Sequence, residues 1–430
     1  MKQIGVSDGE ATKALTILQL LLRDYHPRDF TICLWDGSQW PAETGPARFT
    51  LVLRHPDALR RMLRNAETDL AISEAYIRGK IDVEGDLEAT MPLTNHLMSR
   101  SHSAATVMRV CWELLRMPAG SRLKLAGRQP ARLSGKIHSI DRDREAVTYH
   151  YDVSNDFYAL WLDKLMVYSC AYFETAGEDL DTAQERKLDY LCRKLRLRPG
   201  ERLLDIGCGW GGLIIHAAQR YGVQALGITL SQNQATLANE RIARAGLQDR
   251  CRVEVRDYRD ANTTGGFDKL VSVGMVEHVG ESRLPVYFQH AWQLLRPGGV
   301  FLNHGIARRT TDPEPAGPTF ISRYVFPDGE LVDLNTMLRY AEEAAFEVRD
   351  VENLRDHYTL TLRQWARRLE LHSDRALQVV DEPTYRVWRL FLHGSAYAFA
   401  SGALNIYQSL LVKPDRGSSG LPLTRADWYR

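Results

Sequence analysis

The sequence lacks the features of a disulfide-bonded, zinc-binding or membrane-spanning protein. Its six cysteines are scattered, without a CxxC pair and without histidines spaced to complete a zinc site. The longest apolar run, within residues 14–22, is interrupted by Thr16 and Gln19 and is too short to span a bilayer. No leader with a cleavage site is recognisable near the N-terminus. We therefore expect a cytoplasmic protein that would reach any lipid from the membrane surface.

The chain also lacks an excess of charge of either sign. Lys and Arg total 55 and Asp and Glu total 54, which gives a formal net charge of +1. This balance removes the whole-chain electrostatic argument for a nucleic-acid partner. With 44% hydrophobic and 25% charged residues, the composition is that of an ordinary globular protein, and 430 residues suggest two or three domains.

The first part of the chain predicts a mixed α+β region over residues 10–115. Apolar spacing and turn residues indicate helices and strands in alternation. The expected helices cover 11–22, 57–63 and 68–78, and the expected strands cover 30–35 and 49–53.

Positive charge is concentrated in one segment after this region. Residues 121–136 contain no acid and five basic residues, namely Arg122, Lys124, Arg128, Arg132 and Lys136. Two interpretations remain open. The segment is either a solvated linker or a basic segment that contacts anionic phospholipid headgroups.

From about residue 183 strands and helices alternate, which predicts a doubly wound, mostly parallel sheet of the α/β class. Strands are expected over 202–206, 225–229, 252–255, 269–273 and 300–304, with helices between them. Ser231 is the expected cap of the helix over 232–245, and residues 296–299 are expected to form a turn. The C-terminal part predicts an apolar helix over 390–411 and a turn-rich, partly flexible tail from Lys413.

A glycine-rich turn, Asp205-Ile206-Gly207-Cys208-Gly209-Trp210-Gly211-Gly212, follows the first of these strands. It resembles the S-adenosylmethionine site of class I methyltransferases. In that family an acid usually follows the second strand and binds the ribose. Here no acid stands in that place, so Thr229 and Gln234 are the expected neutral substitutes, and Asp257 is a candidate for binding the adenine amino group.

Three further strings narrow the resemblance. They are Tyr149-His150-Tyr151-Asp152-Val153-Ser154-Asn155-Asp156-Phe157-Tyr158, Tyr168-Ser169-Cys170-Ala171-Tyr172-Phe173 and Ser272-Val273-Gly274-Met275-Val276-Glu277-His278-Val279-Gly280. Together with the glycine-rich turn they resemble the cyclopropane-fatty-acyl-phospholipid synthases, including the mycolic acid cyclopropane synthases. The resemblance is strong over about 140–410 and weaker before that.

The resemblance implies a seven-stranded methyltransferase sheet with a smaller N-terminal α+β domain. It implies an N-terminal lipid- or membrane-binding domain over 1–120, a basic linker over 121–148, and a catalytic domain over 149–430 with a helical cover. It also implies that S-adenosylmethionine binds against Tyr168, Ser169, Asp205, Gly207, Gly209, Gly211, Thr229, Leu230, Gln234, Asp257 and Tyr258.

The implied reaction is transfer of a methylene group from S-adenosylmethionine to a cis double bond of a phospholipid acyl chain. Removing a proton from the added methyl group closes the cyclopropane ring. Family members that this chain resembles hold bicarbonate as the base. Its cradle here would be the backbone groups of Cys170 and Ile306 and the side chains of Glu277, His304 and Tyr358. Ser395 stands where related enzymes often carry a cysteine, so a covalent cysteine mechanism is not expected.

Two alternatives stay open. The same cation could yield a methyl- or methylene-branched chain, or the protein could bind lipid or cofactor without catalysis. The intact Gly207, Gly209, Glu277 and His304 argue against the second alternative. The aromatic residues near the motifs, Tyr168 among them, are expected either to pack the core or to line an acyl tunnel. The expected partners are phospholipid acyl chains on the inner face of the cell membrane, and a homodimer is plausible.

Overall fold

The structure, a computed structural model, describes residues 8–63, 68–99, 103–118, 127–262, 264–311 and 317–429. The chain forms two compact units. The first contains residues up to 130 together with 315–325 and 381–397, and the second contains 131–314, 326–380 and 398–430.

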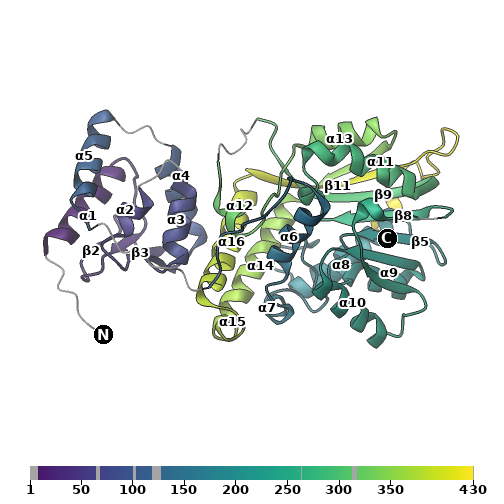
Figure 1. The fold of residues 1–430 in the computed structure, drawn as a ribbon, viewed down its shortest axis with the longest axis horizontal. Coiled ribbons are helices and arrows are strands. Elements are labelled where there is room, and N and C mark those ends of the chain that lie inside the picture. The colour runs from purple at the N-terminus through teal and green to yellow at the C-terminus, as the bar shows by residue number, and fades with distance from the viewer. Residues whose placement is uncertain are drawn as a thin grey trace. The chain divides into compact units, whose positions relative to one another are not determined.

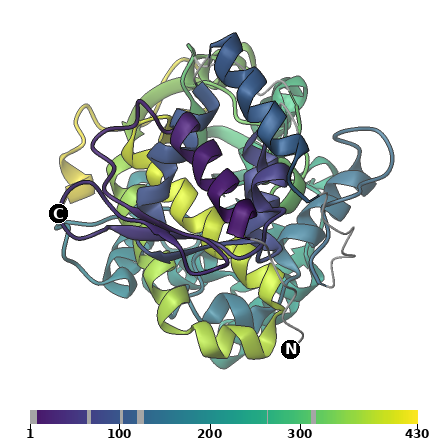
Figure 2. The ribbon, with the colours of Figure 1, turned by 90° about the vertical axis from the view of Figure 1, so that its left-hand side faces the viewer.

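The first unit has a four-stranded sheet in the order β2-β1-β3-β4. β1 and β3 run parallel, and the other two pairs are antiparallel. Helix α1 packs against α5, and one hydrophobic cluster joins them to the strands (Figures 1 and 2). The elements are α1 (Asp8–Leu21), β1 (Thr31–Cys33), β2 (Gln39–Trp40), β3 (Phe49–Leu53), α2 (Ala58–Met62), α3 (Thr68–Ile77), β4 (Ile81–Gly85), η1 (Glu88–Thr90), α4 (Met91–Ser99), α5 (Ala104–Leu115), α12 (Phe320–Tyr324) and most of α16 (Glu382–Ala400).

The second unit is built on a seven-stranded sheet in the order β10-β11-β9-β8-β5-β6-β7. β5, β6, β7, β8 and β9 run parallel to one another, whereas β11 is antiparallel to both β9 and β10. This is the predicted α/β fold with a mostly parallel sheet. The elements are α6 (Ile140–Tyr151), α7 (Asn155–Ala159), α8 (Leu180–Leu195), β5 (Arg202–Ile206), α9 (Gly212–Tyr221), β6 (Gln224–Thr229), α10 (Gln232–Arg244), β7 (Cys251–Val255), η2 (Tyr258–Asp260), β8 (Phe267–Val273), η3 (Val276–His278), η4 (Glu281–Arg283), α11 (Leu284–Leu294), β9 (Leu295–Arg308), α13 (Leu334–Glu343), β10 (Glu347–Asn353), α14 (Arg355–Leu371), α15 (Ser373–Val379), β11 (Leu404–Val412) and η5 (Ala426–Tyr429).

Both faces of this sheet are covered by helices. Figure 1 shows α8, α9 and α10 on one face and α11 and α13 on the other. Successive strand residues point to opposite faces, so Leu203 joins the cluster under α8 to α10 and Leu204 joins the cluster under α11 and α13. The oxygen of Ser231 accepts the backbone N–H of Gln234, which confirms this residue as the cap of α10.

The helix predicted over 390–411 is wrong in its second half. α16 ends at Ala400, Gly402 takes a positive φ of 71°, and 404–412 form strand β11. The apolar pattern misled because β11 lies between two strands and is buried on both faces, so its residues do not alternate with polar ones. Residues 381–397 belong to the first unit.

Smaller expectations also change. The boundary expected at residue 148 falls inside α6, which Ser139 opens, so the second unit begins at 131. The turn expected over 296–299 is a bulge within β9. The tail after Lys413 is turn-rich, as predicted, and mostly exposed, but near its end Trp428 is 3% exposed and joins the core of the second unit.

The basic segment is only partly described. Arg122 and Lys124 lie outside the described residues. Arg128 donates to the carbonyl oxygen of Tyr324 within the first unit, at 3.1 and 3.0 Å, so its guanidinium is engaged by protein. Among the described residues, none of the helices combines the length and apolar composition that a bilayer span requires.

Candidate active site

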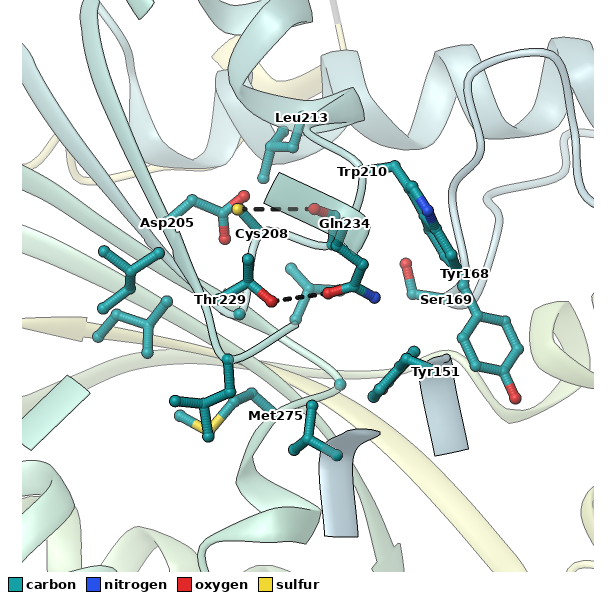
Figure 3. Close-up of a pocket in the computed structure, with 18 of the residues that line it drawn as sticks. Tyr151, Tyr168, Ser169, Asp205, Cys208, Trp210, Leu213, Thr229, Gln234 and Met275 are labelled. Carbon is teal, nitrogen blue, oxygen red and sulfur yellow. Dashed lines mark hydrogen bonds between the residues drawn. The ribbon is translucent and has the colours of Figure 1, made fainter. Parts of the chain in front are cut away.

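A pocket opens at the carboxyl ends of β5, β6 and β8, where ligands bind in sheets of this type (Figure 3). The glycine-rich turn after β5 forms its floor. A side chain on Gly207, at φ 84°, would press against Met275 at 3.0 Å, so this glycine keeps the pocket open beside β8.

The structure brings most of the predicted cofactor residues together. Ten of the eleven line this pocket, namely Tyr168, Ser169, Asp205, Gly207, Gly209, Thr229, Leu230, Gln234, Asp257 and Tyr258. Gly211 is not among the lining residues. It precedes α9 at φ 79°, and an added Cβ would lie 3.2 Å from Ala238, so its role is close packing against α10.

The string over 149–158 closes the pocket from the side of α6 and α7. Asn155 accepts a hydrogen bond from the indole of Trp210 in the glycine-rich turn, at 2.8 Å. Asp152 accepts the hydroxyl of Ser231 at 2.8 Å. Tyr151, at the end of α6, lines the pocket. The string therefore packs directly against the turns that follow β5 and β6.

The part of the pocket that follows β6 carries neutral polar side chains, and the part that follows β7 carries charged ones. Thr229 donates to Oε1 of Gln234 at 2.7 Å (Figure 3), so the amide NH₂ of Gln234 remains available as a donor. Asp257 is 3% exposed and binds the side chain of Arg259 through both carboxylate oxygens at 2.7 Å. The carboxylate of Asp257 thus holds Arg259, which in turn binds Asp143 of α6 at 2.8 Å.

A buried acid and a buried base lie at the other end of the pocket. Lys187 of α8 is 1% exposed and donates to the hydroxyl of Ser169 at 2.8 Å, and Asp205 is 3% exposed. Burial lowers the pKa of Lys187 to about 8, and burial raises the pKa of Asp205 to about 7 against the opposing charge of Lys187.

This donor set fits S-adenosylmethionine. Its amino-acid end is a zwitterion, and Lys187 and Asp205 offer one group of each sign. Its ribose would meet Thr229 and Gln234, and its methyl group could face the turn after β8. When bound, S-adenosylmethionine supplies an electrophilic methyl group.

Glu277 lies beyond this pocket in η3, after β8. Its Oε1 accepts the backbone N–H of Ile306 on β9 at 2.7 Å, so two predicted residues are in direct contact. Its Oε2 is shielded from solvent and has no hydrogen-bond partner among the described residues. Burial raises the pKa of Glu277 to about 7, so at neutral pH the carboxyl group is partly protonated and can donate from Oε2.

His304, two residues before Ile306 on β9, is 1% exposed. Burial, together with the ammonium groups of Lys187 and Lys194, holds the pKa of His304 well below its usual value, so the ring is neutral. Its Nδ1 lies 3.5 Å from Nε2 of Gln408, and its Nε2 has no partner in the described part of the chain. A buried orphaned ring nitrogen is a potential ligand contact.

Cys170 and Tyr358 meet through Leu354. The thiol of Cys170 approaches the carbonyl oxygen of Leu354 at 3.7 Å, and the same carbonyl accepts the backbone N–H of Tyr358 in the first turn of α14. Burial raises the pKa of Tyr358, and the charges of Cys170 and Glu277 raise it further. Burial raises the pKa of the Cys170 thiol, so the sulfur stays protonated and is a poor nucleophile.

Aromatic rings enclose this region. Tyr168 contacts the rings of Tyr158, Trp161 and Trp365 at centroid distances of 5.6, 5.5 and 5.2 Å. Tyr358 packs on Phe399 at 4.7 Å. Phe157, Tyr158 and Trp161 are fully buried, as core packing predicts, whereas Tyr151 and Tyr168 line the pocket. Such a wall excludes water and presents ring faces to a cation.

Several lining residues were not predicted from the sequence: Lys187, Trp210, Arg259, Met275 and His278. A signal was available for Lys187. Lys187 is seven residues after Leu180 and four before Leu191, so the three side chains share one face of α8. This is the face that packs on the sheet. A lysine on such a face is buried and needs a partner.

Comparison with known proteins agrees with this geometry. The family described as mycolic acid cyclopropane synthetase matches residues 138–409, and a domain of unknown function (DUF7884) matches residues 17–104. A probable fatty acid methyltransferase from Pseudomonas putida is 42% identical over 401 residues, covering 92% of this chain and 95% of that protein. The cyclopropane-fatty-acyl-phospholipid synthase of Escherichia coli is 33% identical over 373 residues, covering 85% of this chain and 88% of that protein.

Solved structures give the same result for the second unit. The cyclopropane synthase MmaA2 from Mycobacterium tuberculosis matches with a TM-score of 0.60 and 33% identity, covering 62% of this chain and 97% of that one. The mycolic acid cyclopropane synthase CmaA1 complexed with SAH and CTAB matches with a TM-score of 0.59, the same identity and the same coverage. The chain therefore belongs to the mycolic acid cyclopropane synthetase family and is an S-adenosylmethionine-dependent methyltransferase of that family.

Proposed function

We propose that this enzyme converts a cis double bond of an unsaturated phospholipid acyl chain into a cyclopropane ring, using S-adenosylmethionine as the one-carbon donor. The observation that carries the proposal is the pair of buried atoms without partners among the described residues, Oε2 of Glu277 and Nε2 of His304. They lie beyond the pocket that suits the cofactor. The name of the Escherichia coli relative supports the substrate class.

The chemistry explains why a base site is needed there. The π electrons of the alkene form the new carbon–carbon bond, while the electron pair of the broken carbon–sulfur bond leaves with sulfur. A carbocation remains beside the new methyl group. The electrons of one methyl C–H bond then close the ring, and its proton must go to a base. An alkene needs no activation by an enzyme nucleophile, which agrees with the protonated state of Cys170.

We propose bicarbonate as that base, held by Glu277, His304 and Tyr358 and by backbone groups of Cys170 and Ile306. A bound bicarbonate would accept the proton. The protein's part is to hold a small anion with neutral donors. Protonated Glu277 can donate from Oε2, and neutral His304 can donate from Nε2. Neutral donors suit this site, because they leave the bound anion its negative charge near the developing cation.

A second product is supported by other relatives. The Pseudomonas putida relative is named a probable fatty acid methyltransferase, and one from Mycobacterium tuberculosis, 32% identical over 423 residues, is named a tuberculostearic acid methyltransferase. The same cation gives a methylene-branched chain if a hydride shifts before proton loss. We rank this product second, because it needs a hydride shift in addition to the same proton loss to a base.

One incubation distinguishes the two products. The purified enzyme is mixed with S-adenosylmethionine and vesicles of a cis-unsaturated phospholipid, and the released fatty acids are analysed by mass spectrometry and proton NMR. We expect a mass gain of one CH₂ group, loss of alkene protons and the appearance of cyclopropane protons. The same mass gain with alkene protons retained would instead establish the branched product, and unchanged lipid would contradict both.

A further inference from the structure

Helix α5 of the first unit carries a row of large apolar side chains that face solvent. Val107, Met108, Trp112 and Leu115 are 46, 66, 62 and 72% exposed. Met108, Trp112 and Leu115 are spaced at i, i+4 and i+7, so they lie on one side of the helix. We call Met108, Trp112 and Leu115 the α5 face; Val107, seven residues before Leu114, lies on the other side of the helix. Scattered apolar residues are common on surfaces, but three such large side chains in a row on one side of a helix are not.

The fold of the unit does not account for this face. The opposite side of α5 presents Val110 and Leu114, which are buried in the cluster that includes α1 and the strands. Ser103 caps the helix by accepting the backbone N–H of Thr106 at 3.2 Å. Because the helix is capped and packed through its other side, the α5 face is available for a partner.

Basic groups flank the α5 face. Arg109 and Arg116 are exposed, and the guanidinium of Arg116 lies 5.9 Å from the ring centroid of Trp112. The one acid of the helix, Glu113, has a side chain only 18% exposed and lies 3.8 Å from Arg116. The exposed charge beside the apolar row is therefore positive. Apolar and indole side chains next to arginines suit the interface of an anionic bilayer.

We propose that the α5 face is a membrane-docking surface that inserts Met108, Trp112 and Leu115 among the headgroups and upper acyl chains of an anionic phospholipid bilayer. The proposal rests on the proposed function, because an acyl chain of a phospholipid is presented at such a surface. It places membrane contact on a described, folded helix and does not depend on the basic segment over 121–136. The charge beside the face favours a lipid surface over a second copy of this chain, because two copies would bring their arginines together.

Vesicle flotation tests the proposal without any need for catalysis. The full chain is compared with the triple variant Met108→Ser, Trp112→Ser, Leu115→Ser. The matched control carries Leu371→Ser, Leu377→Ser, Val379→Ser, three apolar residues of the second unit that are 70, 46 and 43% exposed. On vesicles that contain phosphatidylglycerol, we expect the α5 variant to bind about tenfold more weakly than wild type and the control to bind normally.

The charge contribution has its own variant. Arg109→Gln with Arg116→Gln is expected to weaken binding to phosphatidylglycerol vesicles about tenfold at low salt and to leave the weak binding to phosphatidylcholine vesicles unchanged. Cys111 gives a direct readout, because it is the one exposed cysteine among six that the structure describes. A polarity-sensitive fluorophore on Cys111 should shift to the blue on anionic vesicles.

Activity separates this proposal from the proposed function. If both hold, the α5 variant converts lipid in vesicles at least about tenfold more slowly, yet converts the same lipid in detergent micelles at the wild-type rate. If the wild-type enzyme converts the lipid neither in vesicles nor in micelles, the proposed function is wrong. Flotation still tests the docking surface in that case. Wild-type flotation of the α5 variant would overturn the docking proposal. So would a change from dimer to monomer in light scattering with unaltered flotation, which would assign the face to a second copy.

Discussion

Gln408 on β11 lies directly opposite His304 on β9, with its Nε2 3.5 Å from Nδ1 of the imidazole. The orientation of the amide is fixed from the other side, because the ammonium of Lys194 donates to Oε1 of Gln408 at 2.8 Å and also pairs with Glu352. An ammonium group can only donate, so the amide NH₂ faces the ring. Nδ1 of His304 must then accept, and the ring proton is on Nε2, which is the nitrogen without a partner in the described residues.

The variant Gln408→Glu tests this relationship because it keeps the side-chain shape and the contact with Lys194. A carboxylate has no donor for the ring, so it favours the proton on Nδ1 and removes the donor at Nε2. We expect kcat to fall about tenfold or more, with unchanged affinity for S-adenosylmethionine. Nitrogen-15 NMR of labelled histidine should show the change of tautomer.

The matched control is Ser409→Ala. Ser409 is the next residue on β11, is 2% exposed, and its hydroxyl makes no hydrogen bond to any residue that the structure describes. This variant should keep the wild-type rate. If Gln408→Glu also keeps the wild-type rate and tautomer, Gln408 does not position His304.

Glu277→Gln should separate hydrogen bonding from proton transfer. The amide oxygen can still accept from Ile306, and the amide nitrogen can still donate where Oε2 does, but the group cannot take up or release a proton. Because glutamine remains a neutral donor to the bound anion, we expect the rate of product formation at pH 7 to stay within about tenfold of wild type while S-adenosylmethionine still binds. A loss of about a hundredfold would show that Glu277 itself exchanges a proton. Calorimetry and product analysis measure the two quantities.

The pH dependence of the rate should differ between the wild-type enzyme and Glu277→Gln. Because burial raises the pKa of Glu277 to about 7, the protonated, donating form dominates below that pH and is lost above it. The wild-type rate should therefore decline as pH rises through about 7, and this decline should be absent in Glu277→Gln. A parallel decline in both proteins would show that another group titrates.

Gly305→Ala should displace the side chain of Glu277 while leaving Glu277 itself unsubstituted. A Cβ at residue 305 would overlap the Cγ1 of Val276 and lie 3.7 Å from Oε1 of Glu277. Valine is stiff at χ1, so η3 must move away from β9 and weaken the bond between Glu277 and Ile306. We expect a loss of about 1–3 kcal/mol in the free energy of unfolding and a large loss of product. Thermal melts and lipid analysis check both.

Two further variants control for this change. Adding Val276→Ala to Gly305→Ala makes room for the new methyl group and should restore much of the product. Gly9→Ala in α1 adds a methyl group with no described heavy atom within 4 Å, and it should leave activity unchanged. Failure of the rescue would mean that Gly305 matters for a reason other than contact with Val276.

The sequence predicted much of the second unit because its signals are local. Strand β5 and helices α9 and α10 appear where apolar runs, caps and glycines place them. The helix expected over 404–411 failed because the pairing of β11 with two other strands depends on residues about 50 and 100 positions away. The contacts of Gln408 with His304 and Lys194 could not be predicted for the same reason. They exist only once the antiparallel strand is inserted.

The last prediction concerns Lys187, whose ammonium lies in the cofactor pocket with Asp205 and donates to Ser169. If it binds the carboxylate of the cofactor, Lys187→Met should weaken S-adenosylhomocysteine about tenfold or more, because a charge-assisted hydrogen bond is lost. The affinity for 5′-methylthioadenosine, which lacks the amino-acid end, should stay the same. Lys164→Met, at a lysine whose side chain is 60% exposed, is the control and should change neither affinity. Calorimetry with the two ligands decides the matter, since an equal loss for both would show that Lys187 supports the fold of the pocket and does not bind the carboxylate.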